Sequence, residues 1–224
     1  MTTASTYTDQ RDRMRESMAA QAPAELLDGF ARAARRLDQI DFATRGPRIG
    51  ELAPDFVLTD QVGEEVQLAA ILRAGPVVLI FYRGEWCPYC NLQLRSFQAH
   101  LEAFAAHGAQ LVAISPQMPD HSLSMAEKNE LGFRVLSDVG AAVIAHYGLR
   151  YEVDSETRAL LATVGNDLAS YNGEAGWVLP AVATFVIAPG GDVRYASVRG
   201  DWTERAEPTE VLAVLERMAN GRAA

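Results

Sequence analysis

The sequence predicts an α/β fold in which a mixed central sheet is flanked by helices and preceded by a helical extension. From about residue 49 onward, short β-like runs alternate with helical ones, and three strand segments separated by helices are followed by a hairpin and a last helix. A chain of 224 residues is long enough for one large domain. With 49% hydrophobic and 22% charged residues, it has the apolar side chains to bury a core.

The net charge of the chain is −9, from 20 Lys and Arg against 29 Asp and Glu. Such a chain repels phosphate backbones and anionic lipids, so nucleic acid and membranes are disfavoured as partners. The longest strongly apolar run, residues 77–82, is far shorter than the roughly 20 residues that span a bilayer. The first 15 residues carry three arginines with no apolar stretch behind them and do not resemble a secretory signal. We therefore expect a cytoplasmic protein.

Residues 1–46 are predicted to form an N-terminal helical extension. The stretch from 1 to about 20 is polar and mixed in charge, and we expect a loose arm or a frayed helix there. Apolar residues then recur at helical spacing from Leu26 to Ile40, which predicts an amphipathic helix outside the main domain. Its apolar stripe packs either on its own domain or across a dimer interface.

The main domain, residues 47–224, takes its predicted strands from apolar and β-branched runs and its helices from apolar residues three or four apart. In the first half we expect a hairpin near 56–58 with a turn at Gly63, a short helix at 69–73, a strand buried on both faces at 77–82, and one helix from the cysteines to Gly108. In the second half we expect a strand at 111–114, a helix at 122–131 closed by Gly132, and a short helix at 141–147. An insertion at 150–178, with some helix near 157–168, is expected next. We then expect a strand at 184–188, a returning strand at 193–198, and a helix opened by Pro208.

The only two cysteines, Cys87 and Cys90, form a Cys-x-x-Cys pair. A disulfide-stapled framework needs more cysteines than these two. A structural zinc site needs further ligands, and the four histidines lack the usual close spacing, so we assign no metal. The plain alternative is two buried thiols that act as small hydrophobic side chains.

The pair stands where a predicted strand meets a predicted helix, which favours redox chemistry. Proline is preferred at the first helical position, so Pro88 places Cys87 at the N-cap and Cys90 in the first turn. A thiolate on an N-cap residue accepts unpaired amides at the positive end of the helix dipole, which lowers its pKa. The spacing brings the second sulfur within disulfide reach. We predict that one thiolate attacks a peroxide oxygen or an electrophilic sulfur, and that its neighbour then closes a disulfide.

The run from Phe81 to Cys90, FYRGEWCPYC, resembles the active-site segment of peroxiredoxin-like proteins of the alkyl hydroperoxide reductase and thiol-specific antioxidant family. The similarity covers roughly residues 47–218 and includes the segments 50–56, 111–115 and 183–187. The resemblance implies a thioredoxin fold, an antioxidant oxidoreductase, a hydroperoxide substrate, a thioredoxin or low-molecular-weight thiol as reductant, and a homodimer as one possible assembly. The dithiol itself also resembles those of thioredoxins and glutaredoxins.

The sequence departs from the family's Pro-x-x-x-Thr-x-x-Cys pattern, whose three named positions correspond here to Arg83, Cys87 and Cys90. Only the last is kept. The family alignment therefore nominates Cys90 as the attacking sulfur, whereas the helix-cap argument and the thioredoxin comparison nominate Cys87. At this stage we favour Cys87.

The family also has an arginine far along the chain from the cysteine motif. Its position falls near Val182 here, and no arginine stands there. Arg83, Arg199 or Arg205 substitutes for it if one of them folds over the site. The thioredoxin cis-proline position is occupied by Ala183. The candidate substrate-pocket residues are Arg83, Glu85, Trp86, Pro88, Tyr89, Thr184 and Arg205.

Three functions remain open from the sequence. The first is a thiol peroxidase that reduces hydroperoxides through a Cys87/Cys90 dithiol cycle. The second is a thioredoxin-like reductase or isomerase of disulfides. The third is a redox-sensing interaction protein that contacts its partner through the helix at 24–40. No organic cofactor is expected, because the sulfur pair carries two electrons itself and the chain has no phosphate-binding glycine loop.

Overall fold

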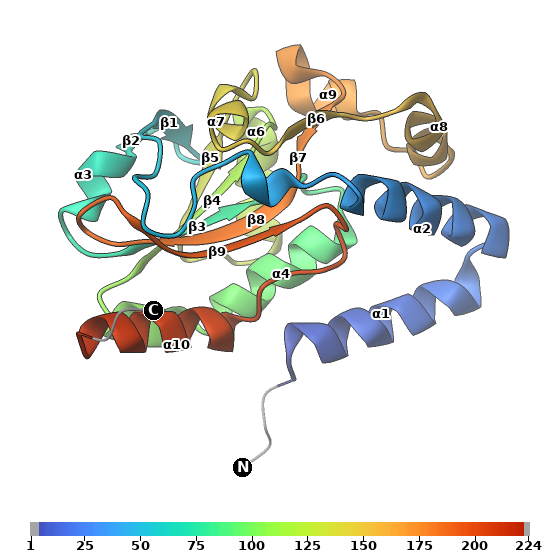
Figure 1. Ribbon diagram of the computed structural model, residues 1–224. Helices are drawn as coiled ribbons and strands as arrows, with labels where there is room; N and C mark the ends of the chain where they lie inside the picture. Colours follow the sequence, from blue (N-terminus) through green and yellow to red (C-terminus); the bar gives the residue numbers. More distant parts are fainter. Residues whose placement is uncertain (1–4, 222–224) are drawn as a thin grey trace.

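A seven-stranded mixed sheet forms the centre of the computed structural model of the protein, which describes residues 5–221 (Figure 1). The strand order is β2-β1-β5-β4-β3-β8-β9. Strands β3, β4 and β5 run parallel to one another, and β8 pairs antiparallel with β3. The strands of this sheet are β1 (Val57–Asp60), β2 (Glu65–Gln67), β3 (Val77–Phe81), β4 (Gln110–Ser115), β5 (Arg134–Ser137), β8 (Val182–Ile187) and β9 (Val193–Arg199).

Helices cover both faces of the sheet, as the sequence predicts. Helices α4, α5, α6 and α10 pack on one face, and α3, α7 and the 3-10 turn η1 pack on the other. The helical elements are α1 (Tyr7–Gln21), α2 (Ala24–Asp38), η1 (Phe42–Thr44), α3 (Leu68–Leu72), α4 (Pro88–Gln98), α5 (Leu101–Ala106), α6 (Pro119–Lys128), α7 (Ala142–His146), α8 (Ser155–Thr163), α9 (Leu168–Asn172), η2 (Gly173–Ala175) and α10 (Pro208–Ala219).

Strand β3 contributes to the two larger hydrophobic cores, one on each face of the sheet. Its five residues are fully buried, because neighbours on both sides and helices on both faces exclude water. Val77, Leu79 and Phe81 point into the core with η1 and α7, while Val78 and Ile80 point toward α4 and α10. This packing holds the end of β3, and the cysteine motif that follows it, in a defined position.

Three expectations about helices in the main domain are wrong in detail. The helix expected to run from the cysteines to Gly108 is two helices, α4 and α5, separated at Ala99 and His100. The helix expected at 122–131 runs from Pro119 to Lys128, and Glu130 rather than Gly132 takes the left-handed backbone conformation after it. The helix expected near 157–168 is likewise split into α8 and α9.

Strand β5 was missed by the sequence analysis, because its apolar core is only two residues long. The insertion at 150–178 contains η2 as well as α8 and α9. It is closed at its base by a two-stranded antiparallel sheet of β6 (Arg150–Glu152) and β7 (Val178–Pro180).

The polar start of the chain is a complete helix rather than a loose arm. Thr6 and Asp9 form a reciprocal capping box at the start of α1. Tyr7 is buried, and its hydroxyl donates to the carbonyl of Thr203 at 2.8 Å. Residues 1–4 of the expected arm lie outside the described residues.

Helix α2 packs on its own chain, where Ala33 and Ala34 contact the loop after β9.

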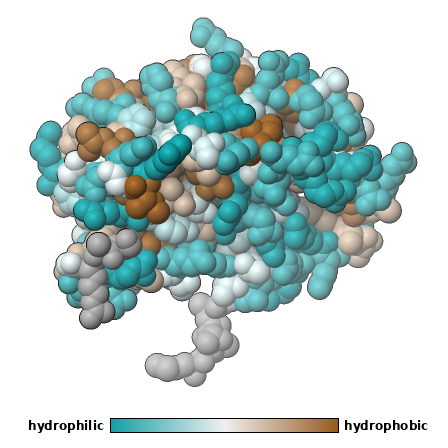
Figure 2. Space-filling model, in the orientation of Figure 1, coloured by the Kyte–Doolittle hydropathy of each residue, from teal (hydrophilic) through white to brown (hydrophobic). Residues whose placement is uncertain are grey.

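Helices α1 and α2 together form a hairpin at one end of the molecule, next to α4 and α8 (Figure 1). On the face seen in Figure 2, hydrophilic residues predominate and hydrophobic ones form separate small patches. No helix within residues 5–221 combines the length and apolar composition needed to cross a bilayer.

We predict that Tyr7 anchors α1. Tyr7→Phe removes the bond to Thr203 and lowers the free energy of unfolding by about 1 kcal/mol, whereas Tyr7→Ala also empties the site of the ring and costs about 3–5 kcal/mol. Urea denaturation of both variants measures these values. Glu16→Ala, an exposed change on the same helix, is the control and should stay within about 0.5 kcal/mol of the parent. A Tyr7→Ala protein as stable as this control would contradict the prediction.

Candidate active site

The cysteine motif begins helix α4 as the sequence predicts. Cys87 is the N-cap residue in an extended conformation, Pro88 occupies the first helical position, and the carbonyl of Cys87 accepts the amides of Cys90 and Asn91 at 3.1 and 3.2 Å. Both cysteines are free thiols and both are buried. Gly84, with a φ of 155°, lets the chain turn sharply between β3 and the helix, where any Cβ would strike Trp86.

The sequence analysis expects the Cys87 sulfur to accept an amide of α4. In the structure, the Cys87 side chain caps no amide of that helix. The sulfur that receives donors is Cys90 instead. The backbone amide of Arg83 donates to Cys90 Sγ at 3.4 Å, and Arg205 Nη2 donates to it at 3.3 Å. Cys90 thus lies between the end of β3 and the loop that leads into α10.

These contacts place the negative charge of the pair on Cys90. Burial raises the pKa of Cys90, but the hydrogen bond from Cys87, the Arg205 guanidinium and the Arg83 amide together lower it to about 5. The pKa of Cys87 is raised well above its ordinary value by burial and by the neighbouring Cys90 sulfur. These shifts favour the proton on Cys87 and the negative charge on Cys90, whereas the helix-cap argument favours the thiolate on Cys87.

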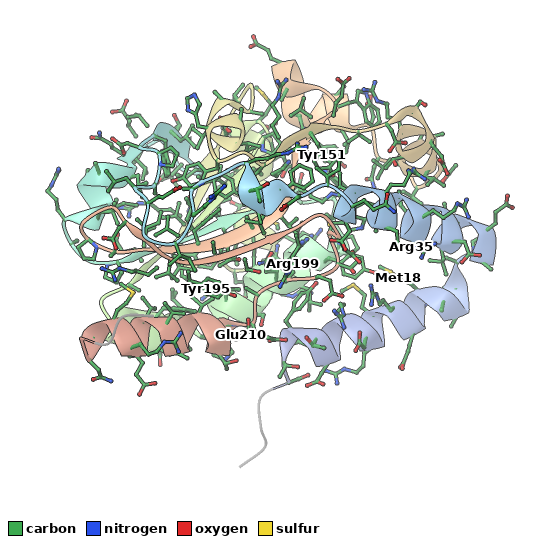
Figure 3. The ribbon with its side chains drawn as sticks, viewed as in Figure 1. Met18, Arg35, Tyr151, Tyr195, Arg199 and Glu210 are labelled. Carbon is green, nitrogen blue, oxygen red and sulfur yellow. The ribbon has the colours of Figure 1, made fainter. Side chains whose placement is uncertain are left out.

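One of the three candidate arginines folds onto the thiolate. Arg205 reaches Cys90 from the loop between β9 and α10, and its Nε and Nη1 are buried without a partner in the part of the chain that the structure describes. Arg83 is also buried, and its guanidinium is stacked between Trp86 and Trp202 at 4.9 and 4.2 Å from the ring centroids. Arg199 is exposed at the end of β9 (Figure 3).

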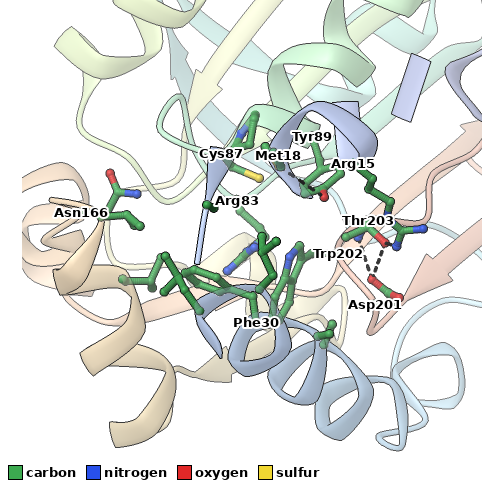
Figure 4. A pocket seen from close by; sticks show the side chains of 18 of the residues that line it. Arg15, Met18, Phe30, Arg83, Cys87, Tyr89, Asn166, Asp201, Trp202 and Thr203 are labelled. Carbon is green, nitrogen blue, oxygen red and sulfur yellow. Dashed lines mark hydrogen bonds between the residues drawn. The ribbon is translucent and has the colours of Figure 1, made fainter. Parts of the chain in front are cut away.

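Five of the predicted residues line one cavity of about 560 Å³, which is bounded by α1, α2, the start of α4, the α8 region and the loop after β9 (Figure 4). The five residues are Arg83, Trp86, Cys87, Pro88 and Tyr89. Cys87 rather than Cys90 forms part of the wall. A substrate in this cavity therefore meets the Cys87 side chain first.

Three predicted pocket residues lie outside this cavity: Arg205, which contacts Cys90, and Glu85 and Thr184. Glu85 pairs with His121, whose Nδ1 lies 2.6 Å from the carboxylate and whose ring packs against Tyr171 at 4.7 Å. This contact fixes the loop before the cysteines. Thr184 is buried in β8, where its hydroxyl accepts from Gln93 Nε2 at 3.3 Å.

Sequence reasoning missed the roles of His121 and Trp202, because nothing in the sequence pairs them with the cysteine motif. The only available signal was the unusually polar segment 199–205, which contains both Trp202 and Arg205. Within the described residues, no group of three His, Cys, Asp or Glu side chains is arranged to hold a metal ion.

The fold and the site define a thioredoxin-fold protein with a redox-type dithiol at the start of a helix. The chain belongs to the AhpC/TSA family, whose sequence profile matches residues 49–196. Chloroplastic peroxiredoxin Q of Populus jackii is 34% identical over 100 residues, which are 45% of this chain and 46% of that protein. The corresponding protein of Sedum lineare is 35% identical over 100 residues, 45% of this chain and 53% of that protein. The chain thus spans about half the length of these relatives.

Solved structures agree with this fold. Peroxidoxin BcpB from Mycobacterium tuberculosis superposes with a TM-score of 0.61 at 25% identity, covering 77% of this chain and 98% of that one. Peroxiredoxin Q from Xanthomonas campestris gives a TM-score of 0.57 at 20% identity, covering 73% of this chain and 91% of that one. The alignments leave out part of the present chain, and the family profile excludes α1 and α2.

We predict that Arg205 sets the ionisation of Cys90. Reactivity of the reduced protein toward a thiol reagent should rise with pH through about 5, since Cys90 is protonated below that pKa. Arg205→Met removes the guanidinium, so the midpoint should move up to about 6–7, while Arg205→Lys keeps the charge and should move it less. The ultraviolet absorbance of the thiolate, followed during a pH titration, measures each midpoint. An unchanged midpoint in Arg205→Met would refute the assignment.

Proposed function

We propose that the protein is a thiol peroxidase that reduces hydroperoxides through a Cys87/Cys90 dithiol–disulfide cycle. The observation that supports this function most strongly is the surroundings of Cys90. A buried thiolate is held by Arg205, whose remaining guanidinium donors have no partner in the described chain. Those donors are available to polarise a peroxide beside the sulfur.

In the proposed first step, Cys90 is the attacking sulfur, and this differs from the preference for Cys87 stated above. The thiolate attacks the terminal oxygen of the hydroperoxide, the O–O bond breaks, and Cys90 becomes a sulfenic acid. The departing alkoxide takes the proton of the Cys87 thiol and leaves as an alcohol. Since Cys87 and not Cys90 lines the cavity, the Cys87 side chain must move aside for this attack.

In the proposed second step, the resulting Cys87 thiolate attacks the Cys90 sulfur. The disulfide forms, hydroxide leaves, and a proton from solvent converts it to water. The overall change consumes one hydroperoxide and two thiols, and yields one alcohol, one water and one disulfide. An external thiol then returns two electrons to the disulfide.

In this proposal, the site replaces the missing family residues with groups of equivalent chemistry. Cys87 stands at the family's threonine position, and its thiol donates to Cys90 as a hydroxyl would. Arg205 supplies the guanidinium that is absent near Val182. These substitutions are the reason to propose peroxide reduction despite the altered motif.

The proposal extends to partners and location. A thioredoxin or a low-molecular-weight thiol is the proposed reductant, because the cycle ends in an intramolecular disulfide that only thiol exchange reopens. We propose the cytoplasm as the location, because two cysteines are fewer than the disulfide-stapled framework of a small secreted protein needs. A homodimer remains part of the proposal.

Reduction of disulfides is the second candidate function, favoured by the position of Cys87 in the cavity wall.

The activity test compares three oxidants. Reduced protein is mixed separately with hydrogen peroxide, an organic hydroperoxide and a model disulfide, and turnover is followed with a thioredoxin system. Peroxide turnover is expected, and Cys90→Ser should reduce it to the background rate. Turnover with the disulfide alone would favour the second function, and stoichiometric oxidation without turnover would favour a redox sensor.

The role of Cys87 is tested with a matched pair of variants. Cys87→Thr keeps a hydrogen-bond donor beside Cys90, so it should form a sulfenic acid at a rate close to that of the parent but no disulfide. Cys87→Ala lacks that donor and should oxidise about ten- to a hundredfold more slowly. Stopped-flow fluorescence gives the rates, and mass spectrometry after sulfenic-acid trapping identifies the oxidised residue. Sulfenic acid on Cys87 in a Cys90→Ser protein would overturn the assignment.

A further inference from the structure

The side chain of Arg83 is a buried cation that the steps proposed above do not use. Its guanidinium is stacked between Trp86 and Trp202, and its Nε has no hydrogen-bond partner among residues 5–221. Within the same residues it forms no ion pair with a carboxylate. A buried charge is costly unless an opposite charge or hydrogen bonds compensate it. The groups nearby that can supply a negative charge are the two cysteine sulfurs.

We propose that the dithiol uses a different arginine in each half of its cycle. Arg205 compensates the charge of Cys90 while the pair is reduced, and Arg83 compensates the charge of Cys87 once Cys90 has become a sulfenic acid. The inference rests on the proposed function for the order of these steps. The interaction between Arg83 and Cys87 needs no peroxide, so it can be measured without one.

The two arginines occupy different parts of the site. Arg205 donates to Cys90 Sγ at 3.3 Å and does not line the cavity of about 560 Å³. Arg83 lines that cavity together with Cys87 (Figure 4). Because it is stacked between two indole rings, the Arg83 guanidinium stays at the cavity wall when the charge of the cysteine pair changes. Each sulfur therefore has a guanidinium on its own part of the site.

The electrostatic contributions divide in the same way. Burial and the neighbouring Cys90 sulfur raise the pKa of Cys87, and Arg83 opposes them more strongly than Arg205 does. Burial also raises the pKa of Cys90, and there the Arg205 guanidinium lowers it more than the Arg83 guanidinium does. Oxidation of Cys90 to a neutral sulfenic acid removes the charge that opposes ionisation of Cys87. Arg83 is then the strongest group that favours the Cys87 thiolate.

Two departures from the family pattern fit this one arrangement. Arg83 stands at the family's proline position, and Cys87 stands at its threonine position. A second thiol at position 87 has to ionise inside the protein before it can attack Cys90. A proline at position 83 carries no charge that favours this ionisation, whereas an arginine does. The arginine thus supplies what the additional thiol needs.

The step that Arg83 assists is the closure of the disulfide. The Cys87 thiolate attacks Cys90 Sγ, the S–S bond forms, and the S–O bond of the sulfenic acid breaks. Hydroxide leaves and takes a proton from solvent. The negative charge thereby leaves Cys87, so the Arg83 guanidinium acts only while that sulfur is ionised.

Alkylation of Cys87 in a Cys90→Ser background measures the interaction without a peroxide. The serine hydroxyl is neutral, as the sulfenic acid is, and Cys87 is then the one thiol in the chain. Iodoacetamide is uncharged and reacts with the thiolate, so its rate at fixed pH follows the ionised fraction. Adding Arg83→Met should slow alkylation about tenfold, because the pKa of Cys87 rises by about one unit. Adding Arg205→Met should slow it at most about threefold.

Two further variants in the same background separate charge from packing. Arg83→Lys keeps the charge and should react at a rate closer to that of Cys90→Ser than Arg83→Met does. Arg13→Met removes an exposed charge on α1 and is the matched control, whose rate should equal that of Cys90→Ser. The inference is wrong if Arg83→Met leaves the alkylation rate unchanged, or if Arg205→Met slows it as much.

The two phases of peroxide oxidation give a second readout in stopped-flow fluorescence. The first phase, oxidation of Cys90, depends on peroxide concentration, and the second, disulfide formation, does not. Arg83→Met should slow the second phase about tenfold and the first at most about threefold, and Arg205→Met should slow the first phase more than the second. Equal slowing of both phases by Arg83→Met would show a merely structural role. If no peroxide is reduced but alkylation follows the expected order, the proposed function fails and the assignment of Arg83 to Cys87 stands.

Discussion

Three groups from separate parts of the chain lower the pKa of the buried Cys90 sulfur and so favour its charged form. The Arg83 amide comes from the end of the central strand, the Cys87 thiol from the start of α4, and the Arg205 guanidinium from the loop before α10. A buried charge without such partners is costly enough that the thiol would stay protonated. The positions of β3, α4 and the loop after β9 are therefore linked through one atom.

Under the proposed function, this arrangement supplies the chemistry of the family's motif from other residues. The requirement is a donor within reach of the sulfur, and the residue type or strand that supplies it is secondary. A thiol replaces a hydroxyl at position 87, and a guanidinium arrives from a loop 115 residues after Cys90 instead of from β8. Under the proposed function, the dithiol then gains a second advantage, because the residue that donates to the thiolate is also the residue that resolves the sulfenic acid.

The N-terminal hairpin adds a second layer to this site. Tyr7 attaches α1 to the carbonyl of Thr203, in the loop that also carries Trp202 and Arg205. Helix α2 packs on Trp202 and on α8 of the insertion. The extension and the insertion therefore meet over the dithiol, and the residues that hold the thiolate are part of the same packed unit as the walls of the cavity.

The sequence by itself determined the class of fold, the central buried strand, the position of Pro88 at the first helical turn and the closeness of the two cysteines, because these depend on local composition and on short, regular spacings. It missed β5, whose apolar run is too short to stand out, and the break between α4 and α5, because apolar spacing continues across it. Tertiary structure alone decided which sulfur receives hydrogen-bond donors, which arginine reaches it, and what covers the site. Those outcomes depend on contacts between residues far apart in the chain, and electrostatic energies at a buried sulfur change with distances that no local pattern encodes.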